Sequence, residues 1–155
     1  MDGYDALRRQ GFRYALALTM DRVDAEDLVH DAWSAVLNAR GPVHVAYLFR
    51  AIRSRWVDRR RRERIVSFLP LEDPHAVPAE ALPPGEHPEV WAALATLRDE
   101  EREALYLTAV EGWTAQEVAD RTGRPRNTVL SLMHRGRAKV RAALEQTRGE
   151  VAHDR

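Results

Sequence analysis

The sequence contains no cysteine among its 155 residues. This absence excludes a disulfide scaffold and any zinc site built on cysteine, and it is typical of a reducing cytosol. No apolar run approaches the roughly 18 residues that a membrane-spanning helix needs. The opening segment MDGYDALRRQ lacks the apolar core of a signal peptide. We therefore expect a cytoplasmic protein that does not insert into a membrane.

Net charge is also absent, because 24 basic residues balance 24 acidic ones. The distribution along the chain is nevertheless uneven. Residues 50–64 carry a net charge of +6, residues 121–141 carry +7, and residues 65–89 carry −5. Two basic segments separated by an acidic one predict two surfaces that bind a polyanion such as nucleic acid. The alternative is that the basic segments are only solvated helix faces.

Strand patterns and internal repeats are missing, and the apolar spacing predicts helices throughout. The first helix is expected over residues 4–20 and the third over residues 45–63. The second is expected to begin at Asp24, whose carboxylate suits an N-cap. Val23 and Leu28 lie at the spacing of a hydrophobic staple around that cap.

Apolar positions of these helices predict a small three-helix module. In the second helix the apolar stripe includes Leu28, Ala32 and Val36, which leaves the acidic side chains of that helix on other faces. In the third helix we expect Leu48 and Ile52 to be buried. Trp56 lies on the same stripe, so burial is favoured over stacking on unpaired bases.

Proline is scarce outside one segment. Residues 65–88 hold six of the eight prolines and no sustained period, which predicts an extended acidic linker. Beyond it, short helices are expected around residues 90–97 and 99–111. The next helix should open at Thr114, because Thr114 and Glu117 have the spacing of a capping box.

A helix-turn-helix pattern follows the capping box. Ala119 is a small residue where two helices can cross, Gly123 is free to take positive φ in the turn, and Val129 is a β-branched core residue of the second helix. Pro125 suits the first turn of that second helix. Together with the surrounding positive charge, the pattern predicts DNA binding.

Helical spacing also separates the two faces of the second helix. Leu132 follows Val129 by three positions, so we expect it in or beside the core. Leu130 falls outside that stripe and should be exposed with Arg126, Asn127 and His134. Arg126 and Asn127 can donate hydrogen bonds to base edges, and Leu130 could touch a thymine methyl group.

Taken together, three segments resemble a bacterial extracytoplasmic-function (group IV) sigma factor: DAEDLVHDAWSAVL (24–37), YLFRAIRSRWVDRRRR (47–62) and the segment that contains WTAQEVADRTGRPRNTVLSLMHRGRAKVRAAL. The resemblance implies an all-α fold of two small helical domains joined by a Pro-rich acidic linker, the second domain being a helix-turn-helix. The expected boundaries are region 2 at 1–64, the linker at 65–88, region 4 at 89–148 and a tail at 149–155.

The resemblance implies an alternative sigma factor, which binds core RNA polymerase through the β′ clamp helices and the β flap and directs it to promoter DNA. The family pattern D-x-E-D-L-V-Q is matched from Asp24 to Val29, with His30 in place of Gln. The residues then expected to bind polymerase are Glu26, Asp27, His30 and Asp31. An anti-sigma protein is left open as a further partner.

The resemblance also implies which residues read the minus-ten element. Ser54 falls where the family has an Asn that helps to hold a flipped base, and Tyr47 replaces a Trp. Arginine side chains along the same helix supply the cations that single-stranded DNA requires. The expected minus-ten contacts are Arg50, Arg53, Ser54, Arg55, Trp56, Asp58, Arg59, Arg60, Arg61 and Arg62.

In region 4 the family segment G-T-V-K-S-R-L-x-R-A-R is matched in part. Leu130 and Leu132 replace its two basic residues, and Gly136 replaces Ala. Arg135, Arg137, Lys139 and Arg141 are expected to meet phosphates, and Arg124 and Arg126 could restore some of the missing charge. The expected minus-thirty-five contacts are Arg124, Arg126, Asn127, Thr128, Leu130, Ser131, His134, Arg135 and Arg137.

Three other functions fit parts of the sequence. A DNA-binding regulator that acts without polymerase would leave residues 24–62 unexplained, and a sigma-like decoy that binds an anti-sigma protein is favoured only by the two leucines. Glu26 and His30 are four residues apart, which a metal site could use. No nucleophile and base pair or phosphate loop appears, so we expect no enzyme activity, no metal and no cofactor.

Overall fold

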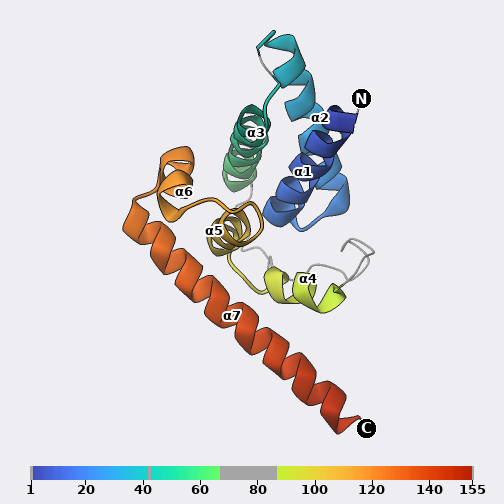
Figure 1. The fold of residues 1–155 in the computed structure, drawn as a ribbon, viewed down its shortest axis with the longest axis vertical. Coiled ribbons are helices and arrows are strands. Elements are labelled where there is room, and N and C mark those ends of the chain that lie inside the picture. Colours follow the sequence, from blue (N-terminus) through green and yellow to red (C-terminus); the bar gives the residue numbers. More distant parts are fainter. Residues whose placement is uncertain (1, 42, 67–86, 155) are drawn as a thin grey trace. The chain divides into compact units, whose positions relative to one another are not determined.

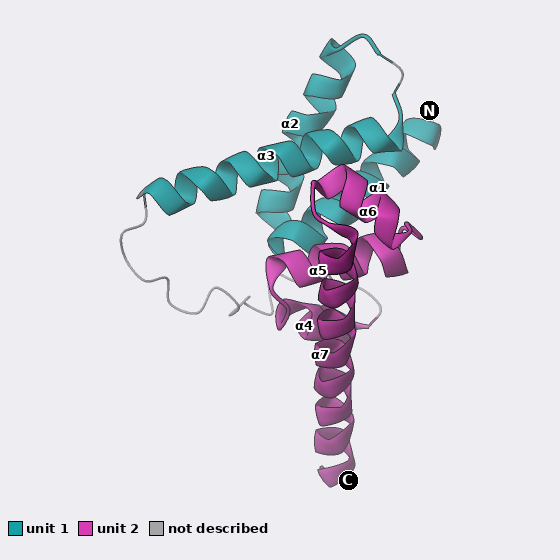
Figure 2. Cartoon of the chain, turned by 90° about the vertical axis from the view of Figure 1, so that its left-hand side faces the viewer, with its two compact units in different colours: residues 1–74 teal, residues 75–155 magenta. Residues whose placement is uncertain are grey.

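A computed structural model describes residues 2–41, 43–66 and 87–154 (Figure 1). Every regular element in these ranges is a helix, which confirms the all-α prediction. The helices are α1 (Asp2–Thr19), α2 (Arg22–Asn38), α3 (Val45–Val66), α4 (Pro88–Ala95), α5 (Asp99–Ala109), α6 (Ala115–Thr122) and α7 (Arg126–His153). Most of the predicted acidic linker, residues 67–86, lies outside the described residues. The chain divides into two compact units, residues 1–74 and 75–155 (Figure 2).

Unit 1 is a three-helix bundle in which α1, α2 and α3 all pack against one another (Figure 2). Its core contains Tyr14 of α1 stacked on Phe49 of α3, with ring centroids 4.4 Å apart and planes inclined by 17°. The predicted apolar stripe of α3 is buried, and Trp56 is only 7% exposed. The burial predicted for Trp56 is therefore confirmed, and its ring is part of the bundle core.

The second helix begins earlier than its sequence pattern suggested. Asp21, in extended conformation, is the N-cap, and its Oδ1 accepts from the backbone N–H of Asp24 at 2.9 Å. The prediction of Asp24 as the cap was wrong, and so was the staple, because Val23 is 67% exposed. With Asp21 as the N-cap, Met20 lies just before the cap and is 2% exposed. Ala25 lies inside the helix and is 0% exposed.

Unit 2 is built around α7, on which α4, α5 and α6 pack (Figure 1). The capping box predicted at the start of α6 is present, with Thr114 and Glu117 exchanging side-chain and backbone hydrogen bonds. Gly123 ends α6 at φ +71°, as the turn pattern predicted. Pro125 lies one residue before the expected place, as the N-cap of α7. Val118 and Val129, both fully buried, join the two helices of the motif.

One glycine sets the spacing of α1 and α3. A Cβ built on Gly11 would lie 2.8 Å from Leu48 Cδ2 and 3.2 Å from Ile52 Cδ1. Both of those side chains are fully buried, so neither has solvent to move into. The bundle therefore needs glycine here for close packing, although a glycine inside a helix is otherwise unfavourable.

Replacing Gly11 by Ala is expected to lower the free energy of unfolding of unit 1 by about 1–3 kcal/mol, because overpacking exceeds the gain in helix propensity. Gly3→Ala is the matched control in the same helix, since a Cβ there meets nothing within 4 Å. Urea unfolding followed by circular dichroism measures both variants. Equal stability of the two would contradict the close packing at Gly11.

Candidate functional site

The first three turns of α7 separate an exposed face from a buried one. Leu132 is 7% exposed and Val129 is fully buried, whereas Leu130 is 38% exposed. This confirms the predicted division between packing and surface leucines. The other side chains assigned to DNA on this helix are all exposed, namely Arg126, Asn127, Thr128, Ser131, His134, Arg135 and Arg137.

Two cations of residues 121–141 form ion pairs with buried carboxylates of α5. Arg124 Nη1 lies 2.7 Å from Oε1 of Glu103, whose side chain is 0% exposed. Lys139 Nζ lies 3.0 and 2.8 Å from the two carboxylate oxygens of Glu101, whose side chain is 2% exposed. Lys139, expected to meet phosphate, is thus ion-paired with a buried carboxylate, while 42% of its side chain stays exposed.

Sequence reasoning missed both carboxylates of α5. Three consecutive charged residues, Glu101 to Glu103, are buried there, and Arg102 bonds to the carbonyl of Leu97 and to Asp99. A signal was present, because Glu101 lies at helical spacing between the apolar residues Leu97 and Ala104. An acidic residue on an apolar stripe indicates a buried charge with a partner.

The basic part of α3 presents most of its arginines at or near the surface of unit 1. Arg50, Arg61 and Arg62 are exposed, and Arg53, Arg55, Arg59 and Arg60 are half-buried. Arg60 lies over the buried Trp56 ring, 5.8 Å from its centroid. Arg59 pairs with Asp24 of α2 at 3.6 Å. The buried Trp56 ring therefore contacts an arginine of α3, Arg60, from inside the bundle.

A surface pocket between α2 and α3 collects several predicted minus-ten residues. Its lining includes Ser54, Arg50 and Arg55 of α3, with Val36 of α2. Tyr47, at the start of α3, also lines it and is 52% exposed. The pocket thus combines an exposed aromatic ring, a hydroxyl and two guanidinium groups. Asp58, which is exposed, does not line it.

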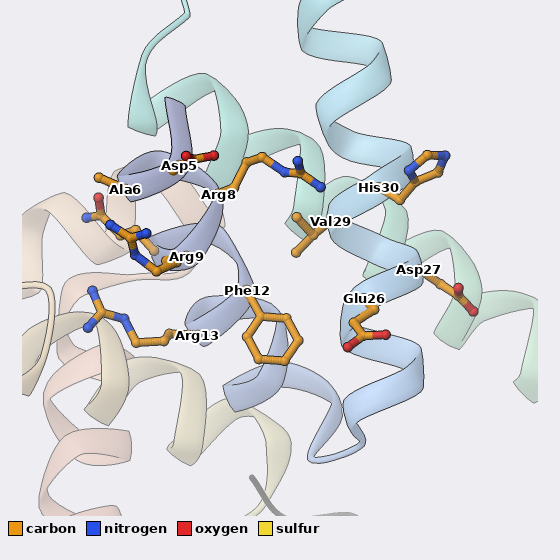
Figure 3. A pocket seen from close by; sticks show the side chains of 11 residues that line it. Asp5, Ala6, Arg8, Arg9, Phe12, Arg13, Glu26, Asp27, Val29 and His30 are labelled. Carbon is orange, nitrogen blue, oxygen red and sulfur yellow. The ribbon is translucent and has the colours of Figure 1, made fainter. Parts of the chain in front are cut away.

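A second groove lies between α1 and α2 (Figure 3). Glu26, Asp27 and His30 line its α2 side, and all three are exposed. Phe12 of α1 lies between the two helices, and Arg8 extends toward α2 (Figure 3). Asp31 is exposed but lies outside this lining. The α1 side of the groove was missed from the sequence, because helix spacing alone does not show which surface α1 turns toward α2.

Unit 2 carries a third, more apolar groove between α4, α5 and α7. Leu94, Leu105, Val110 and Val140 contribute its apolar lining. Three arginines of α7 also line it, namely Arg137, Arg141 and Arg148. The groove lies along residues 137–148 of α7 and does not include Leu130, but Arg137, one of the expected DNA contacts, also lines it.

None of the helices in the described ranges combines the length and the apolar character required to cross a bilayer. No group of three or more His, Asp or Glu side chains is arranged there to hold a metal ion.

Comparison with known proteins matches each unit to one family. The family model of sigma-70 region 2 matches residues 4–65, and that of sigma-70 region 4 matches residues 87–140. The ECF RNA polymerase sigma factor SigE of Mycolicibacterium smegmatis is 32% identical over 168 residues, which cover 98% of this chain and 65% of that protein. The chain therefore spans about two thirds of the length of that relative.

Two further relatives extend the match. The ECF RNA polymerase sigma factor SigL of Mycobacterium tuberculosis is 28% identical, over 92% of this chain and 87% of that protein. Among solved structures, the sigma factor RpoE in complex with the anti-sigma factor NepR from Bartonella quintana has a similar fold. Its TM-score is 0.70 at 20% identity, over 93% of this chain and 95% of that one.

The two neighbouring leucines of α7 should respond differently to the same substitution. Leu132→Lys is expected to lower the free energy of unfolding by about 2–4 kcal/mol, because a buried position receives an ammonium group. Leu130→Lys should change it by no more than about 0.5 kcal/mol, as surface substitutions do. Denaturant unfolding of the two variants checks this. A larger loss for Leu130→Lys would show that the faces are misassigned.

Proposed function

Because the chain belongs to the extracytoplasmic-function sigma factors of the sigma-70 family, we propose that it binds core RNA polymerase in the cytoplasm and directs it to promoters through both units. Members of this family are polymerase subunits without catalysis of their own. Unit 1 would dock on polymerase and read the minus-ten element, and unit 2 would read the minus-thirty-five element. The observation that carries this proposal is that each unit matches its own sigma region and exposes many of that region's expected contacts.

The groove between α1 and α2 is proposed to receive the β′ clamp helices. Exposed carboxylates give little affinity alone, since surface ion pairs contribute about 0–1 kcal/mol. Phe12 and Val29 supply the apolar surface that such a contact also needs, and they line the groove beside Glu26 and Asp27 (Figure 3). The acidic side would select a basic face of the partner and set its orientation.

Reversing charge on the acidic side tests the docking proposal. The Glu26→Lys/Asp27→Lys pair is expected to abolish capture of core polymerase by the tagged full chain, because four units of charge change at the contact. Glu150→Lys, which reverses an exposed acid of unit 2 that does not line this groove, serves as the control and should bind normally. Circular dichroism verifies that the fold is retained. Undiminished capture by the double variant would place the docking surface elsewhere.

The pocket at Ser54 is proposed to hold an unpaired base of the minus-ten element. Tyr47 offers an aromatic ring for stacking, which contributes about 1–3 kcal/mol per base in single-stranded DNA complexes. Ser54 offers one hydroxyl to the base edge, and Arg50 and Arg55 beside it can neutralise the backbone. A hydroxyl can rotate to donate or to accept, whereas an amide holds its donor and its acceptor on separate atoms. This pocket would therefore distinguish bases less sharply than one with an amide.

Replacing Ser54 by Asn is expected to sharpen base preference at one minus-ten position about tenfold, the usual effect of one added bidentate contact. Ser54 is exposed, so the fold should tolerate the larger side chain. Transcription from a promoter with each base at every minus-ten position measures the preference. Arg61→Gln is the control on the same helix and should weaken transcription from all these promoters alike. An unchanged profile for Ser54→Asn would remove Ser54 from the base pocket.

The exposed face of α7 is proposed to enter the major groove of the minus-thirty-five element. Arg126 and Asn127 can bond to base edges, and Leu130 can contact a thymine methyl group. The hydroxyls of Thr128 and Ser131 and the ring of His134 lie on exposed positions of the same turns. Arg135 and Arg137 would bind phosphates and set the register of the helix.

The apolar groove of unit 2 is proposed to bind the β flap. Its apolar lining between α4, α5 and α7 suits a helix with one apolar face, and Arg141 and Arg148 suit acidic residues beside that face. An anti-sigma protein could compete for the surfaces of either unit, which the solved sigma and anti-sigma pair supports by its related fold. Such competition would leave the DNA-reading roles unchanged.

A further inference from the structure

Two cations of residues 121–141 bond to buried carboxylates of α5, although this segment is the one that would approach DNA. Arg124 is 20% exposed, and Lys139, whose Nζ bonds to Glu101, keeps 42% of its side chain exposed. Glu101 and Glu103 of α5 are 2% and 0% exposed. An ionised carboxylate buried to this degree requires a charged or strongly donating partner, because desolvation is costly. Among the described residues, no buried side-chain nitrogen or oxygen lacks a hydrogen-bond partner. Both carboxylates are therefore satisfied, and each has a cationic partner within residues 121–141.

The Glu103 pair acts on the turn of the helix-turn-helix motif. Arg124 follows Gly123, and its backbone N–H donates to the carbonyl of Ala119 at 3.2 Å. Its guanidinium reaches Glu103 Oε1 at 2.7 Å, and its side chain is 20% exposed. The turn is thus fixed at its backbone by α6 and at its side chain by α5. Helix α7 begins two residues later, at Arg126.

The Glu101 pair acts on α7 well beyond the turn. Lys139 lies 13 residues after Arg126, which places the two about 20 Å apart along the helix axis. Between them, α7 approaches α5 closely at Gly136, where an added Cβ would lie 3.4 Å from the carbonyl oxygen of Glu101. One contact before the helix and two along it determine both its axial position and its rotation.

We propose that Arg124 and Lys139 are positioning residues of the recognition helix, held by Glu103 and Glu101, and that neither contacts a DNA phosphate. The proposal rests on the proposed function, since it concerns how α7 reads the minus-thirty-five element. It removes Arg124 from the DNA contacts expected from the sequence. Rotation of α7 by a few degrees would move Arg126, Asn127 and Leu130 relative to the base edges, so these ion pairs govern base preference.

Salt dependence separates a positioning residue from a phosphate contact. Each phosphate neutralised by a protein cation adds about −0.9 to the slope of log affinity against log salt concentration. A cation that bonds to a buried carboxylate adds nothing to that slope. Base discrimination responds in the opposite way, because phosphate contacts carry no sequence information while the orientation of α7 does.

The test uses holoenzyme assembled from core polymerase and the full chain. The probes are duplexes that the unaltered holoenzyme selects from a random library, with scrambled duplexes as reference. Arg124→Gln is expected to reduce discrimination between the two about tenfold and to leave the salt slope unchanged. The pair variant Glu103→Gln/Arg124→Gln should recover most of the discrimination, because two amides can still hydrogen bond and no buried charge is left unpaired. For the second ion pair, Lys139→Gln and the pair variant Glu101→Gln/Lys139→Gln are compared in the same way.

Arg135→Gln is the matched control, an exposed arginine of the same helix. It should lower the magnitude of the slope by about one with little change in discrimination. Thermal unfolding identifies a temperature at which the folded variants remain folded, and binding is measured there. If Arg124→Gln does not fold, the salt slope of the pair variant Glu103→Gln/Arg124→Gln decides the question. A slope reduced by about one in the pair variant would overturn the proposal, as would full discrimination in a folded Arg124→Gln. If the unaltered holoenzyme selects no duplex, the proposed function itself fails, and the inference falls with it.

Discussion

The reading surface of unit 2 depends on the burial of Glu101 and Glu103 within α5. A buried ion pair adds little net stability compared with apolar side chains, because desolvation offsets the attraction, but removing one partner is strongly destabilising. Such a pair therefore penalises every arrangement in which its members are apart. In unit 2 the members are 38 and 21 residues apart in the sequence. The pairs thus favour the one placement of α7 and of the preceding turn in which both carboxylates are bonded at once.

This constraint explains how a chain with zero formal charge can present two cationic surfaces. Acidic residues are placed where they do not oppose DNA: Glu101 and Glu103 inside unit 2, and Glu26 and Asp27 on the α1 and α2 groove (Figure 3). The surface pair of Arg59 with Asp24 is a weaker case, since both side chains are partly exposed and solvent screens them. Net charge is therefore a poor guide to the partner, and the distribution over faces is a better one.

Local signals predicted the parts of the fold that local physics decides. The capping box at Thr114, the left-handed turn at Gly123 and the division between Leu130 and Leu132 each depend on a few adjacent residues, and all three are confirmed. The start of α2 was missed because Asp21 and Asp24 both suit an N-cap. The choice followed from the burial of Met20, which belongs to tertiary packing.

The candidate site was predictable to a similar extent. Spacing along α7 was enough to identify exposed positions, but it could not show that Arg124 and Lys139 are bonded to α5, because those partners are distant in sequence. The groove lined by Phe12 was missed for a similar reason, because it forms only when α1 packs on α2. Conversely, the position of Glu101 on the apolar stripe of α5 was a local signal of a buried ion pair. Only the identity of its partner had to come from the structure.

If α7 reads DNA as proposed, the ion-paired Arg124 and Lys139 and the exposed Leu130 would act in the same direction on DNA recognition. Cations attract any duplex, whereas a leucine can discriminate only through a methyl group or the shape of the base pair. With Arg124 and Lys139 bonded internally and Leu130 on the exposed face, α7 offers fewer sequence-independent contacts than its basic composition suggests. Tethering to a polymerase that already holds DNA raises the effective concentration of the second unit without any such contacts. Under that condition weak general attraction is an advantage, because it leaves a larger share of the binding free energy of unit 2 to the bases themselves.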